Sequence, residues 1–173
     1  MKQLLLVFGL TLFFGGCANA QIVQRLIGKL PAPQMKLTAI DGQTVNTADL
    51  RGKVIVYNLW FVGCPPCMEE IPKLNEIVDE FQGKDVVFIG MSSSSKDDIS
   101  DFIKKKPFKY QIIPNAAALM LGSFGEAMSD GSLNIGFPMH IVVNREGVVT
   151  VKEHGTKGVE AVRQELKKQF ESK

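Results

Sequence analysis

The chain has 173 residues, which suits one domain with a short extension and leaves little room for two. Hydrophobic residues make up 45% of the chain and charged residues 22%, so it can build a normal globular core. The net charge is only +2 and the basic residues are scattered, which argues against nucleic acid or an acidic substrate as a partner.

Residues 1–20 have the organisation of an export signal: a positive start, an apolar stretch over residues 4–14 that is too short to span a membrane, and then small residues. Two processing routes remain open. Ala18-Asn19-Ala20 fits ordinary signal cleavage, whereas Gly15-Gly16-Cys17 resembles a lipoprotein signal with Cys17 as the lipidated residue. Both routes predict a periplasmic or other extracytoplasmic location, and a lipid on Cys17 would be the only membrane attachment.

Residues 21–32 are predicted to be a tether and residues 33–173 the folded domain, because Pro31 and Pro33 punctuate the chain there. Alternation and helical spacing of apolar residues then predict the elements of the domain. Strands are expected at 35–40, 43–45, 53–61, 85–91, 110–113, 139–144 and 147–152. Helices are expected at 47–50 (capped by Thr47), 65–81, 96–105 (capped by Ser95), 116–121 and 157–170, with a loop at 128–136.

The expected strand at 53–61 is apolar on both faces, which is typical of the middle of a sheet that is covered on both sides. A hairpin precedes it, strands and helices alternate after it, and an antiparallel hairpin and a helix close the chain. This order predicts an α/β fold with a mixed central sheet, helices on both faces and an added N-terminal β-hairpin.

Processing would remove or acylate Cys17, so the domain keeps two cysteines, which lie in the run Cys64-Pro65-Pro66-Cys67. A disulfide that closes so small a loop restrains the unfolded chain very little, which makes a structural role improbable. Cys64 should occupy a helix N-terminus, where the helix dipole favours its thiolate, so Cys64 is the predicted nucleophile and Cys67 the resolving thiol. The two prolines remove N–H donors from the thiolate, so we expect a reducing pair.

A zinc site at these cysteines would need two more ligands. The other candidates are His140 and His154, which are predicted to lie on or beside separate strands. We therefore predict no metal site and no cofactor.

The stretch Asn58–Pro72, which contains the two cysteines, resembles the active-site region of the TlpA/ResA/DsbE (CcmG) family of thioredoxin-like proteins. Gly136-Phe137-Pro138 and the hairpin after it resemble the cis-proline strand of the same family, and the resemblance covers most of residues 33–171. It implies a thioredoxin-like fold, an exposed nucleophile at Cys64 and a cis peptide bond before Pro138. It also implies that the client protein is bound by Trp60, Pro65, Phe137 and Pro138.

The resemblance assigns a third catalytic residue, Glu70, which would manage protons for the buried thiol of Cys67. Glu70 follows Cys67 by three positions, so the two share a helix face. Asn58 stands where thioredoxins proper carry an aspartate, which leaves Glu70 as the candidate proton acceptor. The alternative is an exposed glutamate that only complements the helix dipole. Gly63, where the family often has a large residue, leaves the identity of the client open.

These observations predict an exported protein-disulfide reductase that acts on extracytoplasmic client proteins, including the cytochrome c maturation type, and is recycled by a membrane thiol reductase. A peroxiredoxin-type thiol peroxidase is an alternative, although its usual Thr-x-x-Cys setting is absent. A copper-handling assembly protein is another alternative. Such proteins of this fold typically use a C-x₃-C motif with a histidine, whereas here only two residues separate Cys64 from Cys67 and no histidine partner is obvious.

Overall fold

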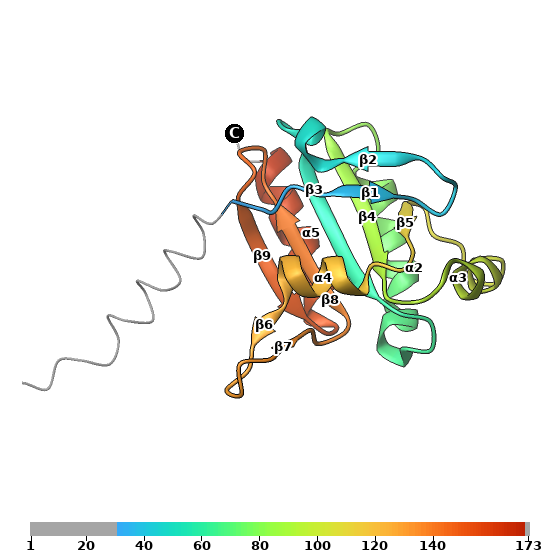
Figure 1. Ribbon diagram of the computed structural model, residues 1–173. Helices are drawn as coiled ribbons and strands as arrows, with labels where there is room; N and C mark the ends of the chain where they lie inside the picture. The colour runs from blue at the N-terminus through green and yellow to red at the C-terminus, as the bar shows by residue number, and fades with distance from the viewer. Residues whose placement is uncertain (1–30, 172–173) are drawn as a thin grey trace, which may run out of the picture.

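The computed structural model describes residues 31–171, and a five-stranded sheet forms its centre (Figure 1). The strand order is β5-β4-β3-β8-β9. β3, β4 and β5 run parallel, whereas β8 is antiparallel to β3 and β9 is antiparallel to β8, which confirms the predicted mixed sheet. The five strands are β3 (Val54–Trp60), β4 (Val86–Ser92), β5 (Gln111–Ile113), β8 (Met139–Val143) and β9 (Val149–His154).

Helices cover both faces of the sheet, as predicted. α2 (Pro65–Glu80) and α5 (Lys157–Glu171) lie behind the sheet in Figure 1, and α4 (Ala117–Phe124) lies in front of it. Side chains along a strand point alternately to its two faces. Val56 therefore packs in one cluster with Leu74 of α2, while Leu59 packs in another with Met120 of α4. Every residue of β3 is buried, which agrees with its apolar sequence on both faces.

The predicted N-terminal hairpin forms a separate two-stranded sheet of β1 (Lys36–Thr38) and β2 (Thr44–Asn46), followed by the 3₁₀ helix η1 (Thr47–Leu50). The predicted Thr47 cap is wrong, because the side chain of Asn46 caps η1 by accepting from the N–H of Ala48. The Thr47 hydroxyl instead accepts from the N–H of Met35 at 2.8 Å and so joins η1 to the start of the hairpin.

The folded domain begins earlier than residue 33. Pro31 forms a bridge with Val148, and the N–H of Ala32 donates to the carbonyl of Gly147 at 2.8 Å, so these two residues belong to the domain rather than to a tether. The predicted signal at residues 1–20, the lipidation candidate Cys17 and the rest of the predicted tether lie outside the described residues. Within residues 31–171, no helix is both long enough and apolar enough to cross a membrane.

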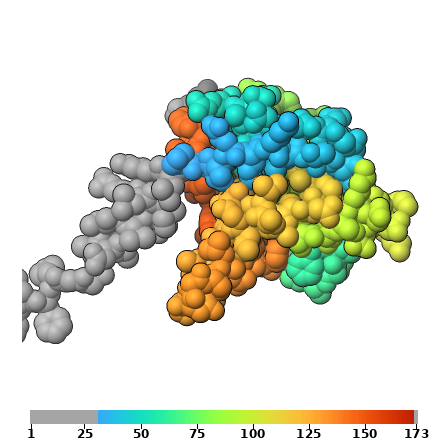
Figure 2. Space-filling model, viewed as in Figure 1, coloured from blue at the N-terminus to red at the C-terminus, as the bar shows by residue number. Residues whose placement is uncertain are grey.

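The predicted loop at 128–136 is partly wrong, because it contains β7 (Leu133–Asn134), which pairs with β6 (Glu126–Ala127) in a small hairpin. The helix before this hairpin, α4, extends to Phe124. Asp130 and Gly131 make the turn of the hairpin: the Asp130 carboxylate accepts from the N–H of Ser132, and Gly131 has a φ of 82°. Figure 2 shows this hairpin projecting from the body of the molecule beside α4. The predicted Ser95 cap is confirmed at the start of α3 (Lys96–Ile103).

Candidate active site

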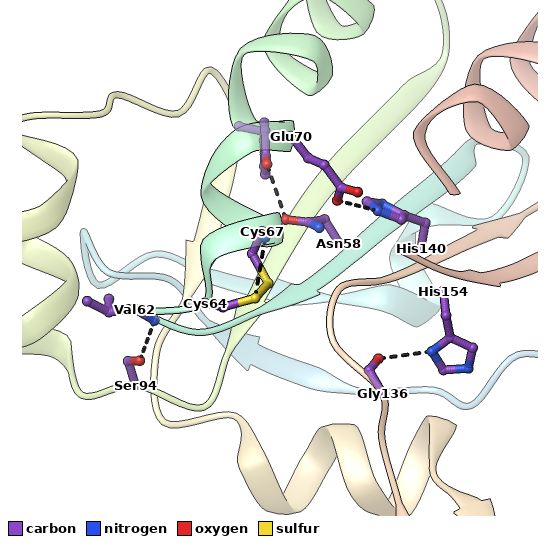
Figure 3. Close-up of a disulfide and its surroundings, with 10 residues drawn as sticks. Asn58, Val62, Cys64, Cys67, Glu70, Ser94, Gly136, His140 and His154 are labelled. Atoms are coloured by element: carbon purple, nitrogen blue, oxygen red, sulfur yellow. Dashed lines mark hydrogen bonds and ion pairs between the residues drawn. A yellow bond between two sulfur atoms is a disulfide. The ribbon is translucent and has the colours of Figure 1, made fainter. Parts of the chain in front are cut away.

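Cys64 and Cys67 form a disulfide where β3 leads into α2 (Figure 3). Cys64 is the N-cap of α2, and Pro65 and Pro66 occupy the first helical positions, where a missing N–H costs little. The first N–H of the helix that remains belongs to Cys67, and it is directed at the sulfur of Cys64 at 3.3 Å. The N-terminus of α2 therefore offers a Cys64 thiolate the helix dipole and one N–H donor.

The turn before Cys64 depends on Gly63, which has a φ of 90°. An L-residue with a side chain is strained in this region, so the backbone conformation of this turn favours the glycine that this chain has there. Ser94 fixes the same turn, because its hydroxyl accepts from the N–H of Val62 at 2.9 Å. The turn thus sets where Cys64 starts the helix.

Both cysteines are only 3% exposed, so the predicted exposed nucleophile is wrong for the disulfide form. The side chains of Phe61 and Phe137 are half-buried and pack against the cluster that contains the two cysteines. Their rings meet edge to face with centroids 5.2 Å apart. Pro65 remains exposed beside this aromatic pair. The surface around Cys64 is therefore an apolar rim.

Trp60 does not belong to that rim, which corrects the prediction that it contacts the client. It is 1% exposed, and its ring packs between Phe102 of α3 and Phe108. Trp60 is the last residue of β3, and every residue of this strand is buried, so its side chain does not face solvent. Its role is to fill the core beneath the cysteines.

The peptide bond between Phe137 and Pro138 is cis, as predicted. Pro138 immediately precedes β8, and the pairing of Leu59 with Met139 places it beside the end of β3, from which the chain runs to Cys64. Pro138 is buried and Phe137 is half-buried. Among the described residues, the backbone N–H and carbonyl of Phe137 have no hydrogen-bond partner.

Glu70 is buried rather than an exposed helix-start residue, since it is 1% exposed. Its carboxylate meets Nε2 of His140, which is 0% exposed, at 2.9 Å (Figure 3). From the sequence, His140 was predicted only as a candidate metal ligand, and its pairing with Glu70 was not predicted. Two atoms of the pair, Oε1 of Glu70 and Nδ1 of His140, have no hydrogen-bond partner among the described residues.

Residues in register on three neighbouring strands lie beside this pair. Asn58 of β3 is opposite His140 of β8 on one side and Gly90 of β4 on the other, so their positions face α2 together. A Cβ at Gly90 would lie 3.0 Å from the ring of Tyr110, so the absent side chain makes room for that ring. The Tyr110 hydroxyl donates to Asn58 at 3.3 Å. Burial first, and then the charge of Glu70, raises the pKa of Tyr110 well above its usual value.

The other metal-ligand candidate, His154, lies at the end of β9 and does not approach the cysteines. Its Nδ1 contacts the carbonyl of Gly136 at 2.9 Å, and its Nε2 contacts the carboxylate of Glu126 at 3.2 Å. Within residues 31–171, no group of three or more His, Cys, Asp or Glu residues is arranged to hold a metal ion. His154 instead connects the β6–β7 hairpin to the segment before Pro138.

Comparison with known proteins agrees with this geometry. Residues 28–168 match the protein family described as Redoxin. The chain is 27% identical over 161 residues to the thiol-disulfide oxidoreductase ResA of Bacillus thuringiensis (strain Al Hakam), which covers 92% of this chain and 87% of the relative. It is 37% identical over 86 residues to the thiol:disulfide interchange protein DsbE of Pseudomonas fluorescens biotype C, which covers 49% of this chain and 44% of the relative.

Solved structures give the same picture of the fold. A thiol:disulfide interchange protein of the thioredoxin family from Chlorobium tepidum TLS superposes with a TM-score of 0.69 at 22% identity, covering 80% of this chain and 94% of that one. These similarities confirm both the predicted thioredoxin-like fold and the resemblance to ResA and DsbE proteins.

Proposed function

This chain belongs to the Redoxin family, and we propose that it works outside the cytoplasm as a thiol–disulfide oxidoreductase that reduces disulfides of client proteins. One observation carries the proposal: a Cys64–Cys67 disulfide at the N-terminus of α2, beside the cis peptide bond of Phe137 and Pro138. A disulfide at such a position has little structural value, but it can be opened, closed and exchanged.

The reaction starts from the reduced pair. The Cys64 thiolate attacks one sulfur of a client disulfide, which forms a mixed disulfide and releases the other client sulfur as a thiolate. Cys67 then attacks the Cys64 sulfur, closes the disulfide and releases the second client thiolate. Two electrons pass from the cysteine pair to the client. Since Cys67 lies one helical turn further into the protein, we assign the first attack to Cys64.

The apolar rim is the surface on which we place the client. Pro65 is exposed there, and Phe137 offers a half-buried ring together with backbone groups that are unpaired among the described residues. An extended client segment can pair with such backbone groups as an added strand does. Pro138 would hold this backbone in place through its cis peptide bond.

Glu70 is the group that we propose takes the proton from Cys67. The two residues share one face of α2, both are buried, and a buried thiol needs a nearby acceptor to become a thiolate. Among the described residues, two other titratable side chains lie near Glu70 at this face. One is its partner His140, and the other is Tyr110, whose raised pKa keeps the hydroxyl protonated.

Our proposal includes export, because residues 1–20 resemble a signal that is either cleaved after Ala20 or processed with lipidation of Cys17. Outside the cytoplasm, the pair needs a membrane thiol reductase to return it to the reduced state. The ResA relative is named a thiol-disulfide oxidoreductase and the DsbE relative a thiol:disulfide interchange protein, so we place thiol and disulfide proteins as the client class, with clients of cytochrome c maturation as one candidate within it.

Reduction of insulin by the purified protein tests the activity. With dithiothreitol as donor, we expect catalysed precipitation of the insulin chains that disappears in Cys64→Ser. Metal analysis and a peroxide-consumption assay on the same preparation address the alternatives. Bound copper without insulin reduction, or peroxide turnover that exceeds insulin reduction, would overturn the proposal.

A further inference from the structure

We infer that His140 is a positioning residue that holds the Glu70 carboxylate in place to accept the proton of Cys67 during closure of the disulfide. The inference rests on the proposed function, because it concerns the step in which Cys67 resolves the mixed disulfide. It starts from the one polar contact of Glu70 in the described structure, the 2.9 Å contact with Nε2 of His140.

The hydrogen-bond pattern assigns the proton of the ring. Nε2 faces a carboxylate oxygen, while Nδ1 of His140 is buried without a partner among the described residues. A buried N–H without an acceptor costs more than a bare lone pair, so the tautomer with its hydrogen on Nε2 fits this site. In that tautomer the ring donates to Glu70, and a hydrogen bond to a charged acceptor is among the strong ones.

Packing fixes the ring in this orientation. A Cβ at Gly158 of α5 would lie 2.2 Å from Cδ2 of His140, so only a glycine lets α5 approach the ring this closely. Asn58 is opposite His140 across the β3–β8 pairing. Packing therefore restricts the orientation of the ring, and in this orientation Nε2 contacts the carboxylate of Glu70 on α2.

The other titratable groups around the pair do not replace this contact. From the β5 side, the Tyr110 hydroxyl donates to Asn58 rather than to Glu70, and burial raises its pKa, so it stays a neutral donor. From β9, Glu153 is the register partner of His140, and its side chain is exposed. α5 presents Gly158 to the ring, and α2 contributes Cys67 itself.

In the mixed disulfide, the Cys67 thiol gives its proton to Glu70, whose carboxylate is held by the Nε2–H of His140. The Cys67 thiolate attacks the Cys64 sulfur, the Cys64–Cys67 bond forms, and the Cys64–client bond breaks. The client sulfur leaves with the electron pair and is protonated by water. His140 neither gains nor loses a proton in this sequence; it keeps Glu70 able to accept one.

Stopped-flow reaction of the reduced full-length protein with dithiobis(nitrobenzoate) separates the two steps. Attack by Cys64 releases the first coloured thiolate in a phase whose rate depends on reagent concentration. Attack by Cys67 releases the second in a phase whose rate does not. A missing first phase in the wild-type protein would refute the proposed function, whereas the second phase alone reports on His140.

Two amide variants provide a matched comparison. The side-chain nitrogen of glutamine reaches the position of Nε2, and that of asparagine reaches only the position of Nδ1. We expect His140→Gln to keep most of the rate of the second phase. We expect His140→Asn to lose at least about tenfold, less than the roughly hundredfold or more that a proton-transfer group itself contributes, because His140 acts only through Glu70. The pH profile of His140→Asn should then resemble that of Glu70→Gln.

A double-mutant cycle excludes a purely structural effect. In the Glu70→Gln background, His140→Asn should slow the second phase little further, because the two residues act as one unit. Equal slowing in both backgrounds, or a His140→Asn rate equal to wild type, would overturn the inference. Nitrogen NMR of the His140 ring in the unchanged reduced protein covers variants that do not fold: a proton on Nδ1 instead of Nε2 would equally overturn it.

Discussion

Cys64 combines two properties at the residue scale: it occupies the N-terminus of α2 and it is covered in the disulfide form. The rings of Phe61 and Phe137 pack against the cysteine cluster, which leaves 3% of Cys64 exposed. We expect a client or a reductant to displace part of this aromatic pair before a sulfur of the disulfide is attacked. The rim would then control access to the disulfide as well as binding of the client.

Removing one ring should open that access. We expect Phe61→Ala to be reduced by dithiothreitol several-fold faster than the wild-type protein, because attack on a disulfide depends on access to the sulfur. Phe170→Ala is the matched control, since Phe170 is also half-buried but packs on Phe81. Acid quenching and alkylation of free thiols give the rates. Equal rates for Phe61→Ala and Phe170→Ala would show that the pair does not cover the disulfide.

At the scale of elements, the turn between β3 and α2 places the cysteines, and Gly63 is its most constrained residue. We expect Gly63→Ala to destabilise the protein by about 1 kcal/mol, because a φ of 90° is unfavourable for alanine. Gly122→Ala is the control: Gly122 lies in α4 with open space where a Cβ would be added. Alanine there should stabilise by about 0.5 kcal/mol.

Urea unfolding measures both glycine variants. A Gly63→Ala protein as stable as the wild type would mean that the turn can relax into another conformation. In that case the turn would not be what sets the position of Cys64.

Local pattern made several elements predictable. β3 is a run of β-prone apolar residues, and α2 has apolar residues at helical spacing after two prolines, so the location of the cysteine pair followed from the sequence. The cis bond at Pro138 followed from the family resemblance. The β6–β7 hairpin was missed because its strands have two residues each, although Asp130-Gly131 is a hairpin turn signal.

The pair of Glu70 and His140 could not be predicted in the same way. The two residues are 70 positions apart, and their contact depends on the register in which β8 pairs with β3. No local pattern contains that register. The burial of Trp60 was missed for a similar reason, because Phe102 and Phe108 reach it from a helix and a loop that follow β4.

At the scale of the whole molecule, Tyr57 is buried and Tyr110 is half-buried against the core, and this predicts how the stability of the protein changes in alkaline solution. Burial raises the pKa of Tyr57 to about 12, and it raises that of Tyr110 still further. Tyrosines in an unfolded chain ionise near about pH 10. Between these values the folded protein holds more protons than the unfolded one, so the free energy of unfolding falls as pH rises.

We expect Tyr57 alone to account for a loss of roughly 2 to 3 kcal/mol across this window, from about two pKa units. Urea unfolding at several alkaline pH values measures the loss, and Tyr57→Phe should show a shallower dependence on pH. Tyrosinate absorbance of the folded protein should stay low near pH 10 and rise only as the pH approaches about 12. A folded protein whose two tyrosines ionise near their ordinary pKa would contradict the buried arrangement around β3 and β5.

The directional role of the two cysteines is tested most directly by locating a trapped mixed disulfide. Cys67→Ala and Cys64→Ala are each incubated with a peptide disulfide, and mass spectrometry identifies the cysteine that carries the adduct. We predict a stable adduct on Cys64 in the first variant, because no thiol remains to resolve it, and little adduct on Cys67 in the second, because Cys67 lies one turn inward. Equally rapid adduct formation in both variants would contradict the account.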